Sequence, residues 1–174
     1  AMLALAYTAA GRKGRVLAGR NAHKTFLSAA ILLDFPIRWL WAGEDYLSCP
    51  VTPEQVERAI LEEGEKPFAV YLTSPDYLGN IADIRGISRV CGKYGVRLLV
   101  DNAHGAYLKF LPESRHPMDL GADLCCDSAH KTLPVLTGGA YLHFREEGMR
   151  GKVKDAMALF GSTSPSYLIM QSLD

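Results

Sequence analysis

One lysine in the second half of the chain stands where a buried strand is expected to end. The stretch DSAHK, from Asp127 to Lys131, follows the apolar run LCC and precedes TLPVL. Moving an ammonium group from water into a partly apolar site lowers its pKa and frees the amine to condense with a carbonyl. The sequence therefore predicts that Lys131 forms a Schiff base with a carbonyl compound.

The carbonyl favoured for an internal lysine is the aldehyde of pyridoxal phosphate, whose ring nitrogen must stay protonated to draw electrons from a substrate. Asp101, which ends the apolar run RLLVD, is placed to hold that proton. Ser128 and His130 flank the lysine and are candidate donors to the phosphate. His23, at an earlier strand end, is expected to lie flat on the ring.

The residues around these positions alternate between helical and strand-like patterns. Expected helices cover 2–9, 23–33, 53–64, 83–94 and 152–159, and expected strands cover 15–19, 37–42, 67–73, 97–101, 123–128 and 139–144. Continuously apolar strands separated by helices indicate a mainly parallel sheet covered on both faces. We therefore expect a three-layer α/β/α fold that forms a single domain over residues 1–174.

Ligands of such sheets bind beyond the carboxyl ends of the strands. Polar residues gather at four of these ends, and three of the four stretches carry histidine: Arg20–His23, Thr73–Pro75, Asp101–His104 and Asp127–Lys131. The chemistry is expected at this edge of the sheet.

Composition narrows the class of protein. The 19 basic and 19 acidic residues cancel, so that no overall charge favours nucleic acid or a membrane surface. The four cysteines show no CxxC pair and no ligand spacing with histidine, so we expect buried reduced thiols and no metal site. The opening AMLALAYTAAGRKGR is no secretory signal and is too short to span a bilayer, so a cytoplasmic protein is expected.

The ends of the sequence suggest an internal piece of a longer polypeptide, truncated at both ends. Residue 1 enters a helical pattern without a capping residue ahead of it. Near the other end, Ser164 is expected to cap a helix with Pro165 in its first turn, and this helix is still periodic at the last residue.

Five blocks together resemble the pyridoxal-phosphate-binding large domain of the ornithine/lysine/arginine decarboxylase family, within the aspartate-aminotransferase-like fold (fold type I). They are GRNAHKTFLSAAILLDF, YLTSPDYLGNIADI, VDNAHGAYLKF, DSAHKTLPVLTGGAYLHF and GSTSPSYLIMQSLD, and they cover nearly the whole chain. The resemblance implies decarboxylation of a basic amino acid by a homodimer or higher homo-oligomer.

The resemblance also implies roles for particular residues. Those in direct reach of the ring would be Lys131 in the Schiff base, Asp101 at the ring nitrogen, and His23 and Ala103 on its two faces. The others would be Ser128 and His130 at the phosphate, Ser162, Thr163 and Ser164 at the phosphate across a dimer, and Thr73, Ser74 and His104 lining the site.

Some alternatives stay open at this stage. The family often has Glu where this chain has Asn102, and its glycine-rich loop and small C-terminal domain are missing, so the chain alone is expected to be inactive. An α-oxoamine synthase and a non-catalytic scaffold of the same fold are the competing interpretations. A second interpretation of His104 is that it only closes the turn at Gly105, and a second interpretation of Asp101 is that it is a turn residue. His116 and His143 are expected at the surface and in the core, respectively, and receive no role.

Overall fold

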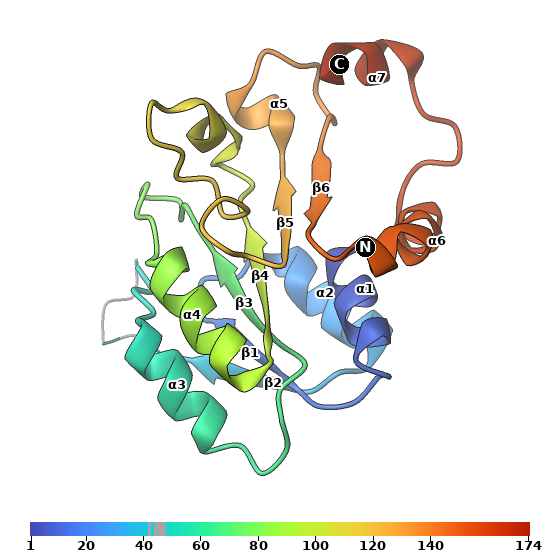
Figure 1. The fold of residues 1–174 in the computed structure, drawn as a ribbon. Coiled ribbons are helices and arrows are strands. Elements are labelled where there is room, and N and C mark those ends of the chain that lie inside the picture. The colour runs from blue at the N-terminus through green and yellow to red at the C-terminus, as the bar shows by residue number, and fades with distance from the viewer. Residues whose placement is uncertain (42, 44–47) are drawn as a thin grey trace.

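A six-stranded sheet forms the centre of the computed structural model, which describes residues 1–41, 43 and 48–174 (Figure 1). The strands are ordered β2-β1-β3-β4-β5-β6. Their bounds are β1 Val16–Gly19, β2 Ile37–Leu40, β3 Ala69–Thr73, β4 Arg97–Asp101, β5 Leu124–Asp127 and β6 Tyr141–Phe144. The first five strands run parallel, and β6 pairs antiparallel with β5.

Helices cover both faces of this sheet. Their bounds are α1 Met2–Ala9, α2 Lys24–Leu33, α3 Pro53–Leu61, α4 Ile84–Tyr94, α5 Ala129–Thr132, α6 Arg150–Phe160 and α7 Tyr167–Leu173, with short 3-10 helices η1 Ala106–Phe110 and η2 Glu147–Met149. One buried cluster joins α3 and α4 to the sheet, and a second joins α1 and α2 to its other face. The expected three-layer α/β/α fold with a mainly parallel sheet is confirmed.

Local sequence signals explain where the longer helices begin and end. Thr52 caps α3 in a reciprocal capping box with Gln55, and Pro53 occupies the first turn. The Asp83 carboxylate accepts the Gly86 N–H at the start of α4. Gly95 ends α4 at φ 63°, a left-handed conformation that suits a residue without a Cβ.

The last helix differs from the expectation. Ser166, not Ser164, caps α7, because the Ser166 hydroxyl accepts the Ile169 N–H at 3.5 Å, whereas the Ser164 N–H is bonded to the Ser162 hydroxyl. Pro165 therefore precedes the cap instead of opening the helix. The expected strand 37–42 ends at Leu40, and Ala42 lies outside the described residues.

The strand order reverses direction between β1 and β3. From β1 the chain crosses to β2 on one side, and from β3 it continues to β4 and β5 on the other, so the crevice between the carboxyl ends of β1 and β3 is the switch point. Among the described residues, no helix combines the length and the apolar character that crossing a membrane would need.

Candidate active site

Asp101 lies at the carboxyl end of β4, and the donors to its buried carboxylate in the described part of the chain are uncharged. The Tyr71 hydroxyl donates to Oδ2 at 3.0 Å, the Ala103 N–H donates to Oδ1 at 3.2 Å, and the Cys126 Sγ lies 3.9 Å from Oδ1. Burial and the nearby carboxylate raise the pKa of Tyr71 well above its usual value, so its hydroxyl stays a donor. No ion pair found among the described residues includes Asp101.

Lys131 reaches toward the same strand end from α5, the single helical turn that follows β5. Its Nζ lies 3.4 Å from Nε2 of His104. Partial burial lowers the pKa of His104, the charge of Lys131 and the proximity of His23 lower it further, and Asp101 acts in the opposite direction. These interactions show that His23, Asp101 and Lys131 all lie near His104.

The lysine itself is exposed in the described chain. The apolar enclosure that was expected to desolvate its ammonium is therefore not supplied by its neighbours here. A neutral His104 imidazole can still accept a hydrogen bond from Nζ, which gives the pair a route for moving a proton.

His23 and Ala103 approach from the ends of β1 and β4. His23 caps α2, and its Nδ1 accepts the Thr25 N–H at 3.3 Å, so the ring of the neutral histidine carries its proton on Nε2. Ala103 is tied down by its own N–H, which is bonded to Asp101. Both residues are half-buried and open toward solvent.

Thr73 and Ser74 end β3 beside Asp101. Thr73 pairs in register with Asp101, and its Oγ1 is buried without a hydrogen-bond partner among the described residues. The Ser74 hydroxyl instead accepts the Ala82 N–H at 3.0 Å and holds the following loop. Thr73 thus has an available polar atom at the site, while Ser74 has a structural contact.

Ser128 and His130 lie on either side of the start of α5. Ser128 is half-buried and makes no capping bond to the helix. His130 donates from Nδ1 to the Gly139 carbonyl at 3.0 Å, so its Nε2 bears a hydrogen only in the imidazolium form. Nε2 is therefore the ring nitrogen of His130 that is left to contact the expected phosphate.

The stretch Ser162 to Ser164 is not brought to the other candidates within this chain. It lies exposed on the connection between α6 and α7, at the periphery of the molecule (Figure 1). Its expected phosphate contacts were assigned across a dimer, and that assignment stays a prediction.

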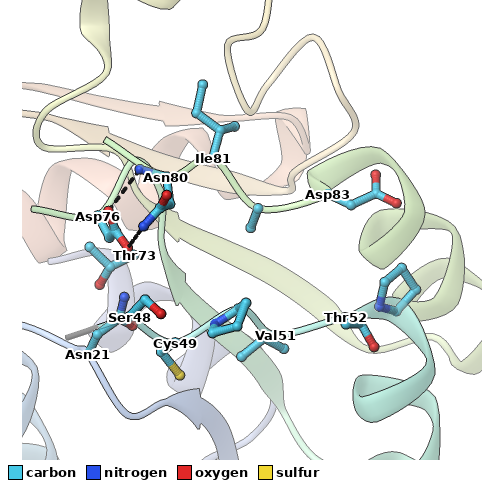
Figure 2. Close-up of a pocket in the computed structure, with 13 residues that line it drawn as sticks. Asn21, Ser48, Cys49, Val51, Thr52, Thr73, Asp76, Asn80, Ile81 and Asp83 are labelled. Atoms are coloured by element: carbon cyan, nitrogen blue, oxygen red, sulfur yellow. Dashed lines mark hydrogen bonds between the residues drawn. The ribbon is translucent and has the colours of Figure 1, made fainter. Parts of the chain in front are cut away.

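Two cavities open near this edge. One of about 480 Å³ borders Asp101, Tyr71, Cys126 and the start of α1. The other, of about 430 Å³, lies at the switch point between Asn21 after β1 and Thr73 at the end of β3, as Figure 2 shows. In this second cavity the Asp76 carboxylate is already bonded to the N–H groups of Leu78 and Asn80 and to the Asn80 amide, so it shapes the loop.

The sequence interpretation missed a buried polar cluster next to the site and was wrong about its histidines. His116 is buried at 3% exposure, and His143 keeps 35% of its side chain exposed, the reverse of the expectation. Both donate to Asp127, which is 4% exposed. Asp127 belonged to the quoted DSAHK stretch, but nothing in the spacing of the histidines pointed to it.

Comparison with known proteins connects this geometry to a family. The family model described as "Orn/Lys/Arg decarboxylase, major domain" matches residues 1–174. An uncharacterised protein, YaaO of Bacillus subtilis (strain 168), is 35% identical over 166 residues, covering 91% of this chain and 34% of that protein. An arginine decarboxylase of Bacillus cereus is 30% identical over 181 residues, covering 100% of this chain and 39% of that enzyme. The chain thus spans well under half the length of these relatives.

Solved structures agree on the fold. The structure of Oryza sativa TDC with PLP and tryptamine superimposes with a TM-score of 0.72 at 21% identity, covering 92% of this chain and 42% of that one. At this identity the likeness establishes the shared architecture.

Proposed function

The chain belongs to the Orn/Lys/Arg decarboxylase family through its major domain, and we propose that the whole protein is a pyridoxal-phosphate-dependent decarboxylase of a basic amino acid: ornithine, lysine or arginine. The observation that carries the proposal is the convergence of Asp101, His104 and Lys131 at the carboxyl edge of β4 and β5. The arginine decarboxylases among its relatives support a basic substrate.

The polar atoms at this edge fit the cofactor. The Asp101 carboxylate is buried at 8% exposure with no cation paired to it among the described residues, and a protonated ring nitrogen would supply that partner. Two buried hydroxyl oxygens lack partners in the described chain: Thr73 Oγ1, on the residue paired with Asp101 across the sheet, and Thr132 Oγ1, on the residue that follows Lys131 in the sequence. The residues present therefore suit a polar, cationic ring system.

Each residue has a distinct task in the proposed reaction. When bound, pyridoxal phosphate supplies the electron sink that accepts the electron pair left as the substrate α-carboxylate departs as carbon dioxide. Asp101 would keep the proton on the ring nitrogen, and Tyr71 and Ala103 keep Asp101 in place. Lys131 would hold the group through Nζ, and His104 would accept a proton from Nζ.

The remaining candidates orient the group. His23, fixed as the cap of α2, and Ala103 would bracket the ring, and Ser128 together with His130 would contact the phosphate. Ser162, Thr163 and Ser164 would complete the phosphate site from a second subunit, which makes a homodimer the smallest active assembly. Orientation of this kind supplies much of the rate that a protein adds to the chemistry of its cofactor.

The test is a decarboxylation assay on the full-length protein. With pyridoxal phosphate present, we expect carbon dioxide release from one of ornithine, lysine or arginine, and loss of that release in Lys131→Ala. Lys109→Ala is the matched control, because Lys109 is paired with Asp119 on the surface. Cofactor binding without carbon dioxide release from any of the three amino acids would refute the proposed reaction, and absence of cofactor binding would favour a scaffold.

A further inference from the structure

The buried carboxylate of Asp127 joins three segments directly below the turn that carries Lys131. Its Oδ2 accepts hydrogen bonds from Nε2 of His116 at 3.0 Å and from Nε2 of His143 at 2.9 Å. Its Oδ1 accepts the Asn102 amide at 2.7 Å. These donors come from the segment after η1, from β6 and from the residue that follows Asp101. The Asp127 side chain therefore connects these three segments to the end of β5.

The hydrogen-bond partners of the two His116 ring nitrogens identify the cluster as a hydrogen-bonded network. Ligating atoms of His116, Cys125 and Asp127 lie within 4.8 Å of one another, a spacing that a metal ion would also accept. However, the Met118 N–H donates to Nδ1 of His116 at 3.3 Å, so the proton of the neutral ring is on Nε2, the atom that faces Asp127. That nitrogen therefore donates to the carboxylate and has no lone pair for a metal.

Asp127 also stays ionised in this setting. Burial alone would raise the pKa of Asp127, but the hydrogen bonds from His116, His143 and Asn102 outweigh it and hold the pKa well below its usual range. Hydrogen bonds to an ionised acceptor are about twice as strong as neutral ones, so the three segments are held firmly.

The turn above this network has few anchors of its own. Helix α5 is four residues long and Lys131 is exposed. Among the described residues, the hydrogen bonds from this turn to other segments include those from the His130 N–H and ring to the Gly139 carbonyl and the contact of Lys131 Nζ with His104. The Asn102 to Asp127 bond links the residue after Asp101 to the residue before Ser128. This bond fixes the spacing between the two proposed reacting residues together with the backbone bond from the Asn102 N–H to the Cys126 carbonyl at 2.9 Å.

We propose that Asp127 is a positioning residue: it holds the Lys131 turn at a fixed distance from Asp101 through Asn102, His116 and His143. The proposal rests on the proposed function in that Lys131 and Asp101 are the reacting groups. It adds a residue that touches neither the cofactor nor the substrate and acts through the end of β5.

The experiment compares Asp127→Asn with Asp123→Asn in the full-length protein. Each substitution replaces one carboxylate by an amide. Asp127 is the last residue of β5, whereas Asp123 directly precedes the strand and accepts the Leu98 N–H at its opposite end. Without cofactor, hydrogen exchange of the peptide covering 128–133 should quicken on the order of tenfold in Asp127→Asn and stay unchanged in Asp123→Asn. With cofactor, the dissociation constant of pyridoxal phosphate should rise on the order of tenfold in the first variant alone.

A second pair of variants covers the case in which Asp127→Asn does not fold. The half-exposed His143 leaves little cavity when it is replaced, and Gln can present an amide N–H near the place of Nε2. His143→Ala should therefore quicken exchange of the same peptide, and His143→Gln should restore part of the protection.

Exchange of 128–133 that is unchanged in both His143→Ala and Asp127→Asn would overturn the inference, whatever the wild type does with cofactor. Equal effects in Asp127→Asn and Asp123→Asn would also overturn it, because they would mean general destabilisation. If exchange quickens in the variants as expected but the wild-type protein binds no pyridoxal phosphate, Asp127 is supported as the anchor of the turn and only the proposed function is refuted.

Discussion

Replacing Asp101 by Asn in the full-length protein should reduce turnover far more than it reduces folding or cofactor retention. The amide keeps an oxygen for the Ala103 N–H and can offer its own N–H to the Tyr71 oxygen, so the contacts that fix the side chain have substitutes. What disappears is the negative charge, and with it the group that is proposed to hold a proton on the ring nitrogen.

The magnitude follows from the burial of this carboxylate. Asp101 is 8% exposed and its hydrogen-bond donors among the described residues are uncharged, so its charge is weakly screened and free to act on a cationic partner. Losing one charge-assisted partner at such a site costs about 2 to 4 kcal/mol, which corresponds to a loss of about 30-fold to 1000-fold in kcat. The free energy of unfolding should change by about 1 kcal/mol or less, which is the usual contribution of a neutral hydrogen bond.

The assay measures kcat, KM and the dissociation constant of pyridoxal phosphate for wild type, Asp101→Asn and Tyr71→Phe. Tyr71→Phe removes one neutral donor to the same carboxylate and keeps its charge, so it should lose only about tenfold or less in kcat. Equal losses in the two variants would refute the reasoning, because Asp101 would then act through its hydrogen-bond geometry and not through its charge. Near-normal turnover in Asp101→Asn would show that the residue is structural.

Three further outcomes follow from the described contacts. Gly105→Ala should destabilise the fold by about 1 to 3 kcal/mol in chemical denaturation, because its Cβ would stand 2.1 Å from Oδ1 of Asn102, whereas Gly92→Ala in α4 meets nothing within 4 Å and should stabilise by about 0.5 to 1 kcal/mol. The pKa of Asp127 is depressed in the folded state, so its contribution to stability is present above the pKa of about 4 that it has in the unfolded chain, and is lost as the pH falls below that value. Unfolding midpoints measured across this pH range should therefore fall less steeply with decreasing pH in Asp127→Asn than in the wild type. Burial raises the pKa of Cys91 to about 12, so a thiol reagent at about pH 8 should modify it only after denaturation, and rapid labelling of the native protein would contradict this.

The sequence predicted the layers and the position of the chemistry because both depend on patterns that the chain repeats. Apolar runs separated by capped helices specify a covered parallel sheet, and the carboxyl ends of parallel strands lie at one edge of such a sheet. Asp101 and Lys131 could therefore be assigned to the same neighbourhood, because Asp101 ends the run RLLVD and Lys131 follows the run LCCD.

What the sequence could not supply was contact between residues whose spacing carries no period. His116 lies in the segment after η1 and His143 lies on an antiparallel edge strand, so their meeting at Asp127 depends on the tertiary path of both segments. The capping of α7 by Ser166 was missed for a local reason. Several serines precede this helix, and the choice among them depends on which hydroxyl reaches a free N–H.

The central claim, that Lys131 is the residue that holds pyridoxal phosphate, is tested most directly by covalent mapping. The full-length protein is loaded with the cofactor, treated with borohydride, digested and analysed by mass spectrometry. We expect a reduced pyridoxyl group on the peptide that contains Lys131 and on no other lysine of residues 1–174. A stoichiometric label on Lys24 or Lys109, with Lys131 unmodified, would contradict the account.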